Sequence, residues 1–105
     1  MIELRGNILT VRAPLTMTLA RQAAESGLAL LKGGDVVVDL AAVTEADSSA
    51  LAVLLAWQRA QRQYGGAMRV VHVPSGLCSI ARVYGMESEI VGLDCDADLP
   101  ARGAR

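Results

Sequence analysis

The chain has 105 residues, of which 52% are hydrophobic and 20% are charged. This length fits one domain, and the composition is too apolar for a disordered chain. The net charge of −1 and the aromatic content of 3% argue against a nucleic-acid partner. Phosphate contacts need clustered cations, and base stacking needs aromatic rings. We therefore expect a single folded domain with an aliphatic core.

The N-terminus favours a cytoplasmic location, and the cysteines show no sign of pairing or metal binding. The first residues lack the basic start and apolar run of a signal peptide. The longest hydrophobic stretch, residues 48–58, is shorter than the roughly 20 residues that a spanning helix needs, so we expect no direct membrane insertion. Cys78 and Cys95 show neither metal-ligand nor disulfide spacing, and we predict two free thiols.

Three strands are predicted in the first part of the chain. Residues 2–5 and 8–12 form a hairpin, because the pair Gly6-Asn7 suits a tight turn. Residues 36–40 form a continuous β-branched run, which is typical of a central strand covered on both faces.

A first helix is predicted between these strands. Thr16 or Thr18 can cap it, and Gly33-Gly34 ends it. Gly27 allows a local irregularity inside it. Its apolar stripe is expected at Met17, Ala20, Ala24, Leu28 and Leu31.

The second half of the chain continues the alternation of helix and strand. A long helix follows residues 47–49 and ends near Tyr64, before a strand at 68–73. A third helix starts at Pro74-Ser75, and a short strand at 90–91 follows it. The third helix is expected to bury Leu77, Ile80, Ala81 and Tyr84.

These elements predict an α/β domain over residues 1–93. The sheet is mixed and mostly parallel, with an antiparallel first strand and three to four helices packed on it. Residues 94–105 have nothing periodic to bury and are expected to form a flexible tail.

The sequence offers little support for a catalytic site or a metal site. His72 is the only histidine, and we expect it to be structural. An enzyme would have to combine Ser48 or Ser49 with His72, without a nucleophile-elbow pattern around the serines. We expect no catalytic residues, no metal and no cofactor.

The segment Asp47-Ser48-Ser49 is the most informative. All three residue types cap helices, and an ordinary cap accounts for at least one of them. A hydroxyl at a helix start also lies where amides favour anions, so it could instead accept a phosphoryl group or a partner's polar side chain.

The helix after this segment has three faces when projected at about 100° per residue. Leu51, Leu54 and Leu55 are expected to face the sheet. A second face is expected to pack against a neighbouring helix, with a partner groove as the alternative: Val53, Trp57, Ala60 and Tyr64. The remaining strip is either a solvated surface or a flat surface for a partner: Ser48, Ala52, Ala56, Arg59 and Gln63.

Residues 35–40 and 42–55, followed by Gly65-Gly66, resemble the signature of STAS domains, the fold of anti-sigma factor antagonists. The likeness covers about residues 1–93. Within this family, residues 14–16 and 51–57 are most similar to MlaB-type subunits, the cytoplasmic STAS component of the Mla phospholipid ABC transporter.

This resemblance implies a non-enzymatic subunit that binds the MlaF-like ATPase of the transporter at the inner face of the cytoplasmic membrane. In the family, the hydroxyl residue directly after the Asp is functional, which is Ser48 here. The surface expected to contact the partner comprises Thr16, Asp47, Ser48, Ser49, Ala52, Ala56 and Arg59.

The alternative is an anti-sigma factor antagonist that a kinase phosphorylates on Ser48. Antagonists usually have Gly where this chain has Ala50, and an acidic pair where it has residues 13–16. Both departures favour constitutive docking on an ATPase.

Overall fold

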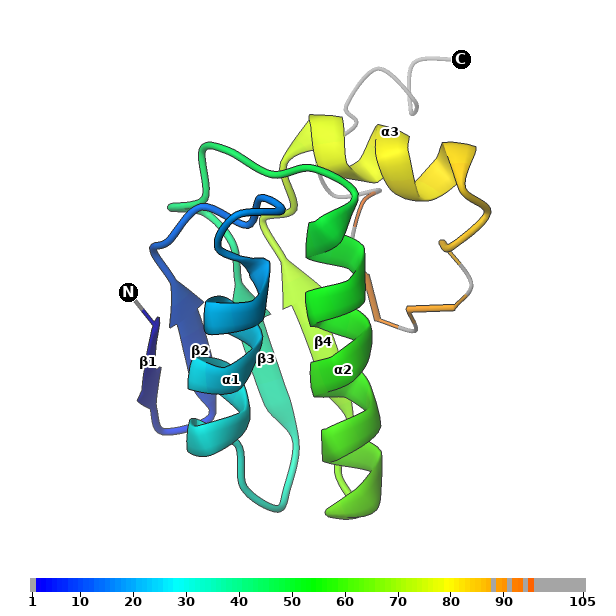
Figure 1. Ribbon diagram of the computed structural model, residues 1–105. Coiled ribbons are helices and arrows are strands. Elements are labelled where there is room, and N and C mark those ends of the chain that lie inside the picture. Colours follow the sequence, from blue (N-terminus) through cyan, green and yellow to red (C-terminus); the bar gives the residue numbers. More distant parts are fainter. Residues whose placement is uncertain (1, 88, 91, 94, 96–105) are drawn as a thin grey trace.

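The computed structural model describes residues 2–87, 89, 90, 92, 93 and 95 (Figure 1). The predicted order of strands and helices is confirmed through the third helix, and so is the α/β fold class. The elements are β1 (Ile2–Arg5), β2 (Ile8–Val11), α1 (Ala20–Leu30), β3 (Val36–Asp39), α2 (Ser49–Gln63), β4 (Met68–Val71) and α3 (Ser75–Val83).

The four strands form one sheet in the order β1-β2-β3-β4. β1 runs antiparallel to β2, and the turn between them contains Gly6, whose φ of 60° is a conformation that glycine adopts at little steric cost. The other pairs are parallel, so α1 and α2 carry the chain back to the start of the next strand. The carboxyl ends of β2, β3 and β4 therefore lie at the same edge of the sheet.

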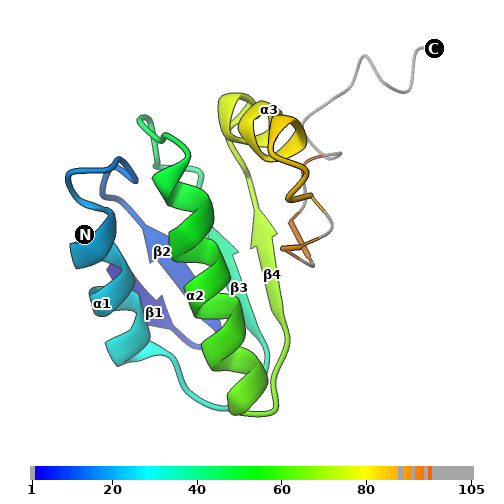
Figure 2. The same cartoon turned by 45° about the vertical axis from the view of Figure 1, so that its right-hand side comes forward.

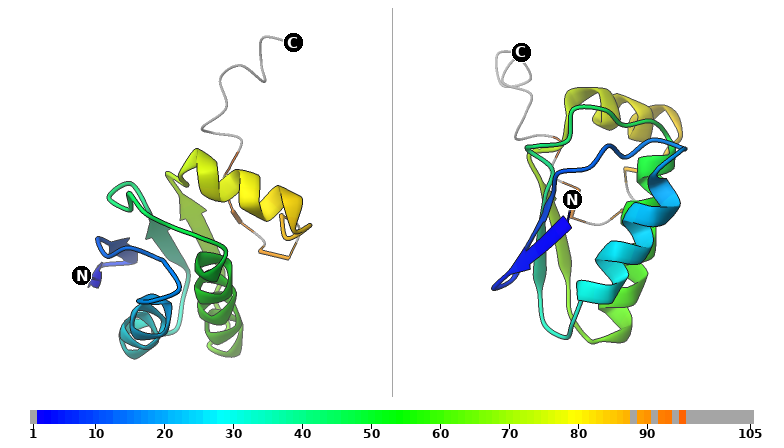
Figure 3. Two further views of the ribbon diagram at one scale, coloured as in Figure 1. Left: turned by 45° about the horizontal axis from the view of Figure 1, so that its top comes forward. Right: turned by 60° about the vertical axis from the view of Figure 1, so that its left-hand side comes forward.

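The helices α1 and α2 lie side by side on one face of the sheet, and α3 lies across its end (Figures 1 and 3). Along β3, Val36 and Val38 are buried while Val37 is only partly buried. The prediction that this strand is covered on both faces is therefore wrong. β-branched residues favour a strand whether or not their side chains are buried. The run therefore predicts the strand but does not show that both of its faces are covered. The largest buried side chains include Leu9, Leu15, Leu40, Leu51, Leu54, Trp57 and Leu77.

The buried side of α1 differs from the predicted stripe. Gly27 is buried, whereas Met17 is 78% exposed and Leu28 is 38% exposed. The reason is the indole of Trp57 on α2, which lies against Gly27 and donates a hydrogen bond from Nε1 to the carbonyl oxygen of Ala24 (3.1 Å). A large ring at a close contact between helices needs small residues opposite it, so the side of α1 that carries small residues faces α2.

The start of α1 also differs from the prediction. The helix begins at Ala20 without a side-chain cap, so neither Thr16 nor Thr18 caps it. The residues before it form a turn in which the N–H of Leu19 donates to the carbonyl oxygen of Thr16 (3.0 Å). The helix continues through Gly27 without a break. The rest of the predicted stripe does pack in the core: Ala20, Ala24 and Leu31.

β4 ends two residues earlier than predicted, at Val71. His72 then adopts a φ of 55°, which is uncommon for a residue with a side chain, before the chain enters α3. The predicted strand at 90–91 is replaced by an isolated parallel bridge between Val70 and Leu93. Val91 lies outside the described residues.

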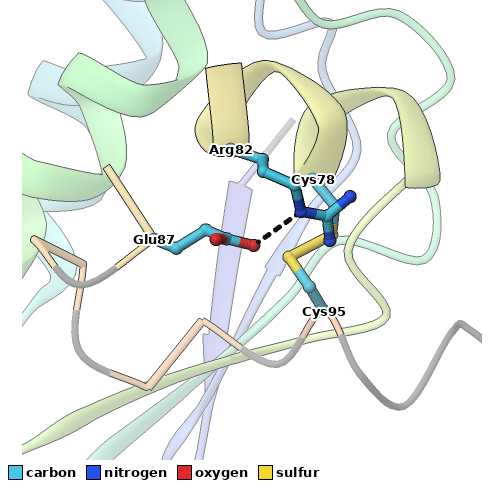
Figure 4. The surroundings of a disulfide bond; sticks show 4 residues. All are labelled: Cys78, Arg82, Glu87 and Cys95. Atoms are coloured by element: carbon cyan, nitrogen blue, oxygen red, sulfur yellow. Dashed lines mark hydrogen bonds and ion pairs between the residues drawn. A yellow bond between two sulfur atoms is a disulfide. The ribbon is translucent and has the colours of Figure 1, made fainter. Parts of the chain in front are cut away.

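Cys78 and Cys95 form a disulfide bond, so the prediction of two free thiols is wrong (Figure 4). The two cysteines are separated by 17 positions, and their Cα atoms are 5.8 Å apart. The number of residues between the two cysteines does not predict this pairing. Cys95 reaches α3 only because the chain after the helix folds back, and this depends on the burial of residues such as Ile90. The boundary after residue 93 stays a prediction. Apart from Cys95, the predicted tail lies outside the described residues.

Substituting Gly27 by Ala tests the contact between α1 and α2. A Cβ at this position would overlap the ring of Trp57. We expect Gly27→Ala to lower the free energy of unfolding by about 1 to 2 kcal/mol, although Ala is the better helix former. Gly76→Ala in α3 is the matched control, because nothing lies within 4 Å of its Cβ position. Urea unfolding followed by Trp57 fluorescence measures both, and equal effects of the two substitutions would contradict the contact.

Candidate functional site

Asp47 joins the start of α2 to the loop before α1. Its Oδ1 accepts a hydrogen bond from the backbone N–H of Ser49 (2.8 Å), and its Oδ2 accepts one from the N–H of Met17 (2.9 Å). Asp47 therefore satisfies one of the N–H groups that a helix start leaves unpaired. Ser48 occupies the N-cap position, but its hydroxyl makes no capping bond. The helix itself does not use the Ser48 hydroxyl.

The same two N–H donors lower the pKa of Asp47. The bond from Met17 has the largest effect and the bond from Ser49 the next, while desolvation acts in the opposite direction. Both donors favour the ionised form, so Asp47 is a carboxylate at neutral pH.

Backbone pairing holds the loop before α1 in the same place. The N–H of Leu15 donates to the carbonyl oxygen of Glu45 (2.9 Å). The N–H of Asp47 donates in turn to the carbonyl oxygen of Leu15 (3.1 Å). Leu15 is fully buried, while Thr16 is partly exposed. Because Leu15 and Met17 both bond to Asp47, Thr16 lies close to the start of α2, as the predicted partner surface requires.

Ser48 lines an open hollow of about 270 Å³ between the start of α2 and α3. The other lining residues are Ser79, Ile80, Val83 and Tyr84. Val83 is 79% exposed and Tyr84 is 60% exposed. The predicted hydroxyl therefore lies in an accessible, mainly apolar surface depression.

The contribution of α3 to this hollow was not predicted from the sequence. Ile80 and Tyr84 were both expected on the buried face. Ile80 is partly buried and packs against the core while it also lines the hollow, whereas Tyr84 is 60% exposed. Tyr84 is the C-cap residue, one position beyond the helix, so the helical period does not carry its side chain into the core. Gly85, directly after Tyr84, was the signal in the sequence that the helix ends before Tyr84, so that Tyr84 is not part of its buried face.

The exposed strip predicted on α2 is accessible. Ala52 and Arg59 are exposed, and Ala56 is partly exposed. The faces predicted to pack are largely buried, through Leu51, Val53, Leu54 and Trp57, with Leu55 and Ala60 partly buried. Tyr64 is the exception at 52% exposure, because it too is a C-cap residue.

Two buried glutamines on α2 were also missed. Nε2 of Gln58 donates to the carbonyl oxygen of Glu89 (2.9 Å), and Nε2 of Gln61 donates to that of Gly34. Each Oε1 is without a hydrogen-bond partner among the residues that the structure describes. These amides tie α2 to the segment after α3 and to the loop before β3.

His72 pairs with Asp39 and not with the candidate serines. Its Nδ1 lies 3.0 Å from Oδ1 of Asp39, which also accepts the N–H of Ala41 (2.9 Å). The bond from Ala41 is the main cause of the lowered pKa of Asp39, and His72 contributes in the same direction. Within the described part of the chain, no hydrogen bond joins His72 to Ser48 or Ser49.

Metal-ligating residues are dispersed in the described part of the chain. Over residues 2–87 and the five described residues beyond them, no group of three His, Cys, Asp or Glu could hold a metal ion. Among the helices described, none has the length and apolar character needed to cross a membrane.

Comparison with known proteins identifies a family for almost the whole described domain. The family model for "Mlab, STAS domain" matches residues 2–92. This match confirms the resemblance of the sequence to STAS domains of MlaB type. The family is generally non-enzymatic. No curated protein matches the sequence.

Replacing Asp47 by Asn removes the charge and keeps the shape. A carboxyl group with a lowered pKa stabilises the folded protein above the ordinary Asp pKa of about 3.9, and this contribution is lost as pH falls through the folded value. We expect Asp47→Asn to lower the urea midpoint at neutral pH, and the difference from wild type to shrink below about pH 4.

Glu45→Gln is the control for this pH series, because Glu45 is exposed and its carboxylate takes part in no described bond. It should leave the urea midpoint nearly unchanged. A destabilisation by Asp47→Asn that stays constant from neutral to acidic pH would contradict a role for the ionised carboxylate.

Proposed function

Because the chain belongs to the STAS domain family of MlaB type, we propose that it is a non-enzymatic subunit that binds the ATPase of an Mla-type phospholipid ABC transporter and supports it. The observation that carries this proposal is the hydroxyl of Ser48, which lies in an open hollow and does not cap its own helix. The docking surface consists of Thr16, Asp47, Ser48, Ser49, Ala52, Ala56 and Arg59, together with the hollow.

The chemistry of the hollow suits a protein partner. Val83 and Tyr84 line it as large apolar side chains that are 79% and 60% exposed, and Met17, which lies in the loop before α1 and outside the hollow, is 78% exposed. Aromatic residues and Met are enriched in protein interfaces, where they surround a few hydrogen-bonding groups. A side chain of the partner that enters the hollow would cover the apolar residues and could bond to the Ser48 hydroxyl.

The strip on α2 extends this surface along the helix. Ala52 and Ala56 follow Ser48 at intervals of four residues, so all three lie on one side of α2. Their small side chains allow the backbone of a partner to approach closely. Arg59 is exposed one turn further on and can pair with an acidic group of the partner.

The site supports binding without catalysis. A serine nucleophile needs an adjacent base, and the imidazole of His72 pairs with Asp39. The partner also determines the location in this proposal. An ATPase on the cytoplasmic side of a transporter would hold the protein in the cytoplasm, at the inner face of the membrane.

A second candidate function uses the same hydroxyl. An anti-sigma factor antagonist would be phosphorylated on Ser48, and the accessibility of this side chain suits that reaction too. Two departures from that group favour docking on the ATPase. Ala50, which stands where antagonists usually have Gly, is fully buried. The loop that carries an acidic pair in antagonists instead contributes Leu15 to the core.

Two substitutions test the docking surface. Ser48→Glu places a charge in the hollow, and Ala52→Arg places a long side chain on the strip. We expect each to weaken binding to the transporter ATPase encoded nearby by at least about tenfold, because an unpaired charge or a clash at an interface costs several kcal/mol. Co-purification with the tagged ATPase and titration calorimetry measure the effect.

Ala29→Arg is the matched control for Ala52→Arg, because Ala29 is an exposed alanine on α1, outside the docking surface. It should bind like the wild type. Unchanged binding by Ser48→Glu and Ala52→Arg would contradict the docking surface. No binding of the ATPase by the wild type, together with a phosphate on Ser48 after incubation with ATP and an anti-sigma factor kinase, would favour the second function.

A further inference from the structure

The disulfide lies directly beside the proposed docking surface. Cys78 precedes Ser79 and Ile80 in α3, and both of these residues line the hollow that contains Ser48. Cys78 itself is 2% exposed, and Cys95 is 6% exposed. The cross-link therefore acts on the helix that forms one side of the hollow, without being part of the surface that a partner touches.

The helix α3 has few other anchors. It lies apart from the layer formed by α1 and α2, across the end of the sheet (Figure 2). A helix of nine residues is too short to be stable by itself. Its remaining buried side chains are Leu77 and Ala81, and Ile80 is partly buried against the core. An ion pair joins Arg82 to Glu87 (Nε to Oε2, 3.1 Å), but both side chains are 47% exposed, so it contributes little (Figure 4).

Described residues between α3 and Cys95 are held in place by contacts with other elements. The carbonyl oxygen of Glu89 accepts a hydrogen bond from Nε2 of Gln58 on α2 (2.9 Å). The carbonyl oxygen of Gly92 accepts one from the N–H of Val70 on β4 (2.8 Å). Through Cys95, the disulfide therefore ties α3 to contacts with α2 and β4.

We propose that this disulfide is a redox-controlled latch on the docking surface. The oxidised form holds α3 beside Ser48, and reduction to two thiols releases α3 and weakens docking. The inference rests on the proposed function, because a partner ATPase places the protein in a compartment where most thiols are kept reduced. Disulfides that form in such a compartment are usually transient and are either redox-sensing or catalytic. In this chain the disulfide lies next to the proposed binding surface.

The reaction is a thiol–disulfide exchange with oxidised glutathione as the oxidant. One cysteine loses its proton, and the thiolate attacks a sulfur of oxidised glutathione, which gives a mixed disulfide and one glutathione thiolate. The thiolate of the second cysteine attacks the protein sulfur of this mixed disulfide and releases the second glutathione thiolate. The two electrons end on the two glutathione molecules, which take up the two protons. Because both cysteines are buried, exchange requires local opening of the segment that carries Cys95.

Hydrogen exchange on the full chain tests the latch. Wild-type protein is treated with oxidised glutathione or with dithiothreitol, and alkylation with mass spectrometry counts the free thiols. We expect amide exchange in α3 to be about tenfold faster in the reduced form, with exchange in α1 unchanged. The affinity for the transporter ATPase should fall about tenfold on reduction. Cys95→Ser cannot form the bond and should behave like the reduced wild type in both buffers, which also controls for effects of the reagents on the ATPase.

Three results would overturn the latch. The first is equal exchange of α3 in the oxidised and reduced forms. The second is faster exchange throughout the chain on reduction, which would make the disulfide a general structural cross-link. The third is equal affinity for the ATPase in both forms. If neither form binds the ATPase, the proposed function fails, and the exchange of α3 still decides whether the disulfide holds this helix.

Discussion

Asp47 is the residue on which the geometry of the candidate site depends. A parallel sheet brings the carboxyl ends of its strands to one edge, but the loops that leave this edge have no regular pairing of their own. Asp47 joins two of these loops, because its carboxylate accepts one N–H from Met17 and another from Ser49. The carboxylate takes over the capping of α2, which leaves the hydroxyl of Ser48 available to a partner.

The elements predicted correctly are those with local signals. The β-branched residues 36–38 predict a strand wherever it lies in the sheet. Gly65 adopts a φ of 81° directly after α2, so the end of this helix is encoded by a residue that can take this conformation. The beginning of the same helix is encoded by Asp47. These signals marked the segment Asp47-Ser48-Ser49 as a candidate, because its position depends only on where α2 begins, and the family resemblance singled out the hydroxyl of Ser48 within it.

The parts that could not be predicted depend on contacts between distant segments. Met17 has helical spacing with the apolar residues of α1, but its N–H is bound to Asp47, thirty positions later, and the helix begins only at Ala20. Gly27 is buried because the ring of Trp57 lies against it. The pairing of Cys78 with Cys95 depends on how the chain returns after α3. None of these contacts has a signature in the residues next to it.

The candidate site therefore has two sides whose positions arise differently. The side formed by α2 is held by a carboxylate with a lowered pKa, which stays ionised over the neutral range, and by backbone bonds to the loop before α1. The side formed by α3 carries Val83 and Tyr84, and its cross-link ends at Cys95, outside the strands and helices. A partner can contact both sides at once only when α3 keeps its position, and that position depends on the chain after α3 through the disulfide. In our proposal, docking at Ser48 therefore depends on a residue 47 positions later in the chain, at Cys95, that the partner need not touch.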